Sequence, residues 1–86
     1  MTINGKTYEN KPINLDSLLE IERLGSTWDD LTNRPFTFLV AYTAYCMGAD
    51  TETAKREIEK FVYQGGALSD LVNGLTVIVA KSPFAR

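Results

Sequence analysis

Few side chains in this sequence belong to the types that carry out catalysis or bind metals. Histidine, the commonest general base and a frequent zinc ligand, does not occur. The single cysteine, Cys46, therefore has no imidazole to activate it, and it lies in a hydrophobic stretch that favours the neutral thiol. We interpret Cys46 as a core or interface residue and expect neither a nucleophilic site nor a zinc site.

The acidic residues and the glycines also lack the spacing of known sites. The run ADTETAKREIE, at 49–59, has neither the glycine nor the twelfth-position glutamate of a calcium loop. INGK and YQGGA lack the spacing of a phosphate loop, so we interpret them as a turn and a helix cap. Paired carboxylates stay open as acid–base groups, but they fall on predicted polar faces with nothing to perturb them. We expect a protein that is not an enzyme and needs no cofactor or metal.

Length, charge and cysteine content restrict the class of protein. A chain of 86 residues makes one domain, and a domain this small buries only about 60 to 65% of its unfolded surface. A net charge of -2 and an isoelectric point near 5.0 offer no basic field to nucleic acid. No uncharged run is long enough to cross a membrane. One cysteine and the lack of a signal-peptide pattern at the start predict a reducing cytoplasm.

The chain begins with a predicted β-hairpin. The Asn-Gly pair at 4–5 is a strong signal for a two-residue turn. This turn gives the cross-strand pairs Thr2–Thr7, Ile3–Lys6 and Met1–Tyr8. An isolated two-stranded hairpin is marginally stable, so the face with Ile3 and Tyr8 must pack on the helices or the edge must pair with another chain. Both interpretations stay open.

Four helices are expected after the hairpin. The first follows Asn14 as its cap and ends before Gly25, with an apolar stripe of Leu15, Leu18, Leu19 and Ile21. The second, PFTFLVAYTAYCMG, begins at Pro35, after a single turn that Asp29 or Asp30 could cap. The third follows Asp50 or Thr51 and ends at Gly65 and Gly66. The last, beginning at Leu68, contains the strand-favouring LTVIVA, but its apolar residues fall on one helical face.

The predicted fold class is therefore α+β and mostly α. An N-terminal β-hairpin is followed by about four short helices in a small bundle. The domain comprises the hairpin at 1–13, a helical part at 14–81 and a tail at 82–86.

The central helix, PFTFLVAYTAYCMG, carries no charge and is apolar around its whole circumference, which predicts burial on more than one side. One arc holds Phe36, Leu39, Val40, Thr43 and Met47. The opposite arc, with Phe38, Ala41, Tyr42 and Tyr45, is covered either by the last helix or by a partner. The candidate partner-binding residues are the large apolar side chains of this arc, the hairpin and the irregular segments: Ile3, Tyr8, Trp28, Phe38, Tyr42, Tyr45 and Phe84.

Both ends of the sequence resemble one known family. TINGKTYENKPINLDSLLEIERLG is similar to the opening of the short tail assembly chaperones of long-tailed phages and prophages, in which an INGK-x-Y hairpin leads into a leucine-rich helix. GGALSDLVNGLTVIVAKSPF is similar to that family's closing amphipathic helix, followed by Lys-Ser. The compact length and Pro12, at the usual strand exit, depart from the family pattern.

The resemblance implies a non-enzymatic chaperone of the host bacterial cytoplasm. Such a protein coats the tape measure protein and helps recruit tail tube subunits, often as a homo-oligomer. Two other interpretations stay open. A small helical DNA-binding regulator would fit the size, although the basic residues at 55–60 are balanced by glutamates. A generic protein-interaction module is the other.

Overall fold

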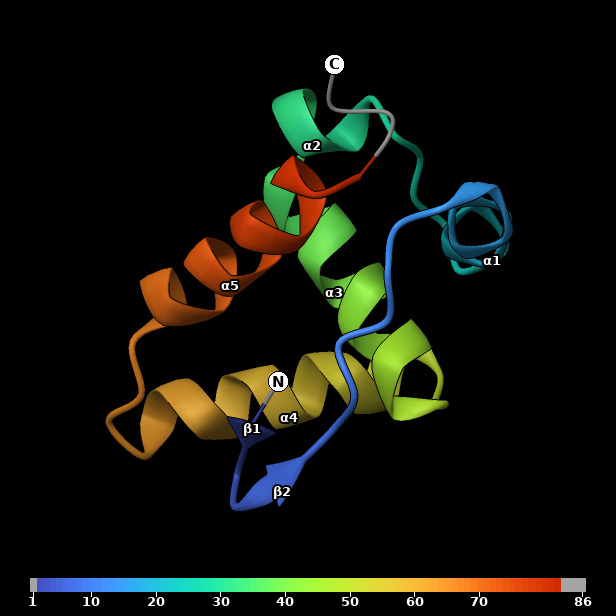
Figure 1. Ribbon diagram of the computed structural model, residues 1–86. Coiled ribbons are helices and arrows are strands. Elements are labelled where there is room, and N and C mark those ends of the chain that lie inside the picture. Colours follow the sequence, from blue (N-terminus) through green and yellow to red (C-terminus); the bar gives the residue numbers. More distant parts are fainter. Residues whose placement is uncertain (1, 83–86) are drawn as a thin grey trace.

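The computed structural model describes residues 2–82, and these form a two-stranded hairpin and five helices (Figure 1). The strands are β1 (Thr2–Ile3) and β2 (Lys6–Thr7). The helices are α1 (Leu15–Arg23), α2 (Asp30–Asn33), α3 (Pro35–Met47), α4 (Thr51–Tyr63) and α5 (Leu68–Ala80). The predicted class, a mostly helical α+β fold with an N-terminal hairpin, is confirmed. The single turn expected near Asp29 and Asp30 is α2.

The hairpin has the predicted register and packs on its own chain. Asn4 and Gly5 have φ of 53° and 80°, the left-handed values that a two-residue hairpin turn requires. The described pairs are Thr2–Thr7 and Ile3–Lys6, whereas the predicted pair Met1–Tyr8 involves Met1, which lies outside the described residues. Ile3 is buried in the core, and the Asn4 side-chain amide donates to the backbone oxygen of Glu57 in α4 at 2.9 Å. The sequence left open whether the hairpin packs on its own helices or pairs with another chain, and in the structure it packs on its own helices.

Helix α1 begins as predicted but faces the core differently. The Asn14 side chain accepts a hydrogen bond from the Ser17 backbone N–H at 2.9 Å, as an N-cap does. The buried residues of α1 are Ser17 and Ile21, one turn apart, whereas Leu15 and Leu19 are 62% and 56% exposed. The predicted apolar stripe is therefore wrong for both leucines, because they lie on the helix side opposite the buried pair.

Helix α3 is the centre of the fold. Figure 1 shows it with α1 and α5 on opposite sides and α4 across its end, and all three helices contact it. Its buried residues surround the helix, as its uncharged sequence predicts: Phe38, Leu39, Ala41, Tyr42, Thr43, Ala44 and Cys46. Phe36, in the first turn of α3, is 57% exposed, so the burial predicted around this helix begins at Phe38.

The segment 8–14, between the hairpin and α1, closes the core over α3. The Tyr42 hydroxyl donates to the backbone oxygen of Lys11 at 2.6 Å. The Lys11 ammonium in turn donates to the backbone oxygen of Tyr45 at 3.1 Å and lies 4.5 Å from the centre of the Tyr45 ring. The Ser17 hydroxyl donates to the backbone oxygen of Pro12 at 2.6 Å. These contacts tie the segment to both α1 and α3.

The last two helices also follow the sequence signals. Asp50 caps α4 by accepting from the Thr53 backbone N–H at 2.8 Å, and Gly65 follows the helix with φ of 94°. Residues 68–80 form a helix despite their strand-favouring composition. In α5 the side chains of Leu71 and Leu75 are buried, which fits the helical period that predicted this element.

Candidate partner-binding surface

The predicted partner-binding residues do not form one surface. Phe38 and Tyr42 are fully buried, and Ile3 is 1% exposed. Three others are partly buried and pack against the core: Tyr8, Trp28 and Tyr45. Phe84 lies outside the described residues. The aromatic arc expected on α3 is therefore core in this chain, because the segment 8–14 and the neighbouring helices cover it.

Burial also changes the acidity of the central tyrosine. Loss of solvent raises the pKa of the Tyr42 hydroxyl well above its ordinary value of 10.0, and the neighbouring Cys46 and Tyr45 add to the effect. The hydroxyl stays protonated and donates to the Lys11 carbonyl. Tyr42 thus has a structural role, and its hydroxyl is not a candidate acid or base.

An apolar groove runs along α5, on the side that faces the N-terminal segment. Two adjoining hollows of about 300 and 570 Å³ share Asn10, Gly74 and Ile78 in their walls. The first extends toward Phe61 of α4, and the second extends toward residues 12–14. We call the two hollows together the α5 groove. With dimensions of this kind it can accept apolar side chains from another polypeptide.

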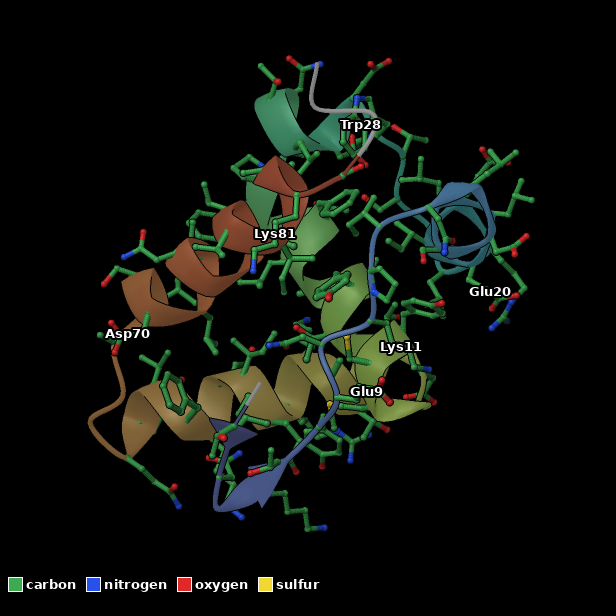
Figure 2. All side chains as sticks on the ribbon, in the orientation of Figure 1. Glu9, Lys11, Glu20, Trp28, Asp70 and Lys81 are labelled. Carbon is green, nitrogen blue, oxygen red and sulfur yellow. The ribbon has the colours of Figure 1, made fainter. Side chains whose placement is uncertain are left out.

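The two ends of the α5 groove carry opposite charges. Asp70 lines the groove in the first turn of α5, and Lys81 lines it just after the last turn. Figure 2 shows the two residues at opposite ends of the helix. Neither side chain forms an ion pair with any residue between 2 and 82. A partner could therefore be recognised by charge as well as by apolar contact.

Gly74 lies at the middle of the groove, where the two hollows join. Glycine inside a helix costs about 1 kcal/mol relative to alanine. Apart from the neighbouring backbone of its own helix, a Cβ placed on Gly74 would meet no atom of the described chain within 4 Å, so packing does not require a glycine here. The missing side chain leaves a notch in the wall of the groove.

Three exposed residues of α5 and Lys81, which follows it directly, share one face. Asp70, Gly74, Val77 and Lys81 follow one another at spacings of four, three and four residues, which places them within a narrow arc of a helix. Val77 is 55% exposed and stands between the notch and Lys81. We call these four residues the α5 stripe. The hydrophobic pattern of the sequence does not reveal the stripe, because Val77 is its one large apolar residue.

We also examined the described residues for a metal site, a membrane span and a reactive thiol. No three His, Cys, Asp or Glu side chains between 2 and 82 are grouped as a metal site would need. None of the helices in the same part of the chain has the length and apolarity to cross a bilayer. Cys46 is buried.

Comparisons with protein-family models, with curated proteins and with solved structures gave no match to this chain. Its function therefore has to be inferred from the α5 groove and from the residues at the two ends of the sequence.

Proposed function

We propose that this chain is a non-enzymatic tail assembly chaperone of a long-tailed phage or prophage, acting in the cytoplasm of the host bacterium. Its client is the tape measure protein, and it helps to bring tail tube subunits to that client. The hairpin opening and the amphipathic ending of the sequence support the family. The observation that carries the binding role is the α5 groove, an apolar channel with an open notch at Gly74.

The groove suits an apolar helical segment. Helix α5 has 13 residues and is about 20 Å long, which matches roughly four turns of a bound helix. Helices bind such grooves by inserting apolar side chains at helical spacing. Val77 is exposed and Ile78 partly so, and burying a side chain of this size contributes roughly 1.5 to 3 kcal/mol. A long apolar client that is covered in this way is protected from aggregation.

Co-expression with the tape measure protein tests this proposal. The natural chain is expected to keep the tape measure protein soluble. Val77→Asp, which puts a carboxylate on the groove wall, is expected to remove that effect while the helical circular dichroism stays unchanged. Leu19→Asp is the matched control, because Leu19 is 56% exposed against 55% for Val77 but lies on α1.

The possible outcomes of this experiment test the chaperone role and the α5 groove as its binding site separately. A tape measure protein that aggregates with the natural chain present would contradict the chaperone role. Full protection by Val77→Asp would leave the role standing and remove the groove as its site. If the client is unprotected but other helical peptides bind the groove, the chain is the generic interaction module that its sequence also allows.

A further inference from the structure

The α5 stripe is complementary to itself when reversed. Gly74 lies four residues after Asp70, and Val77 lies four residues before Lys81. In an antiparallel pair that sets Asp70 opposite Lys81 of a second copy, Gly74 must therefore lie opposite Val77. The same holds for the other half of the pair. Opposite charges then meet at both ends, and each exposed valine faces the other helix's notch.

We infer that a second copy of this chain occupies the α5 groove, with the two α5 helices antiparallel about a two-fold axis between Leu75 and Thr76. Two-fold symmetry repeats each contact, so one complementary pair becomes two. Antiparallel helices also place the positive end of one dipole beside the negative end of the other. The open space at Gly74 lets the valine of the partner approach, where any larger residue would hold the helices apart.

The size of the stripe indicates a weak dimer. Four residues a side are few compared with the roughly 20 to 30 of a standard interface, so we expect a Kd of order 100 µM. A weak dimer can be displaced by a longer helix. The inference deepens the proposed function, on which this last point rests, because the second copy would shield the groove until the client replaces it.

Charge reversal in the full chain tests the pairing. Asp70→Lys puts two cations on the stripe, and Lys81→Glu puts two anions there. Each variant should repel itself and dimerise roughly tenfold more weakly than the natural chain. An equimolar mixture of the two should associate as well as the natural chain does, and the double variant should regain homodimerisation. Sedimentation equilibrium at low salt measures all four.

Matched charge changes on α4 provide the control. Glu59→Lys and Lys55→Glu alter the charge by the same amounts on exposed positions outside the stripe. They are expected to leave the association unchanged. Heteronuclear NMR on dilution of the natural chain should move the amide signals of residues 70–81 before any others.

Three results would overturn the inference. One is a natural chain that stays monomeric at millimolar concentration. Another is a mixture of the two charge variants that associates no better than either alone. The third is a Val77 side chain that is shielded from solvent to the same extent at every protein concentration. The groove would then hold a segment of the same chain and not a second copy. Since no client is present, failure here leaves the chaperone role untouched, and failure of client rescue leaves the dimer untouched.

Discussion

Asp30 shows how a single side chain can stabilise a turn. Its carboxylate is buried and accepts from the Ser26 hydroxyl at 2.8 Å, the Thr27 backbone N–H at 3.1 Å and the Arg34 guanidinium at 3.0 Å. The sequence indicated only that an aspartate could cap a turn here. These donors, Ser26 first and Thr27 next, hold the pKa of Asp30 below its ordinary value of 3.8.

The depressed pKa of Asp30 predicts a loss of stability in acid. The charged carboxylate favours the folded state above the unfolded pKa, and this contribution disappears as the pH falls through the folded pKa. Asp30→Asn should therefore lower the Tm at about pH 7, and its difference from the natural chain should shrink toward about pH 2. Thermal unfolding followed by circular dichroism measures this, with the exposed Asp29→Asn as control. A constant difference at every pH would contradict it.

At the scale of elements, the hairpin is attached to α4 through its turn. The Asn4 amide donates to the Glu57 carboxylate at 2.6 Å as well as to the Glu57 backbone oxygen. Asn4→Asp keeps a residue that tolerates positive φ but replaces the donor with a second carboxylate. We expect it to reduce the free energy of unfolding by about 1 to 3 kcal/mol.

A second change tests the cause of that loss. Combining Asn4→Asp with Glu57→Gln restores a donor opposite the carboxylate and should recover part of the stability. Urea unfolding of the single and double variants measures the coupling between the two sites. If the single and the double variant lose the same free energy of unfolding, the backbone of the hairpin turn and not the contact between residues 4 and 57 is responsible.

Gly74 makes helix α5 less stable than an alanine at the same position would. Gly74→Ala adds a methyl group that no atom beyond the neighbouring backbone of its own helix approaches within 4 Å, so the free energy of unfolding should rise by about 1 kcal/mol. The same change should weaken the self-association, because it fills the notch. Gly48→Ala, at φ of 67°, is the opposite control and should destabilise. Urea unfolding and sedimentation give the two readings, and a rise in both would contradict the role of the notch.

The sequence predicted the elements better than their orientation. The turn at Asn4, the caps at Asn14 and Asp50 and the end of α4 at Gly65 depend on neighbouring residues, so local rules find them. The face that α1 presents to α3 depends on residues far away in the chain. Apolar residues lie on both faces of α1, Ile21 on the buried one and Leu15 and Leu19 on the exposed one, so hydrophobic pattern alone could not decide between them.

For the whole molecule, the decisive contacts join the N-terminal segment to the central helix. Lys11 and Tyr42 are 31 residues apart, and nothing near either residue signals their hydrogen bond. The sequence therefore left open whether the chain itself or a partner covers the aromatic arc, and in the fold the chain covers it. The same segment, 8–14, that packs on the central helix also forms one wall of the α5 groove.

Tyr42→Phe tests how much the segment contributes to the global fold. The change leaves the Lys11 carbonyl without its donor, and we expect the free energy of unfolding to fall by about 1 to 2 kcal/mol. Tyr63→Phe is the matched control, because Tyr63 is 85% exposed. Urea unfolding compares the two. An equal effect of both variants would contradict the proposed role of this hydrogen bond.

Because Cys46 is buried, its reaction with a thiol reagent can report when the helices around α3 separate. It is the only thiol in the chain, and it is 7% exposed on the central helix. A thiol reagent can reach it readily only when the helices around α3 separate, so its labelling rate reports transient opening. The natural sequence therefore offers a direct way to ask whether the proposed client, once bound, slows this opening.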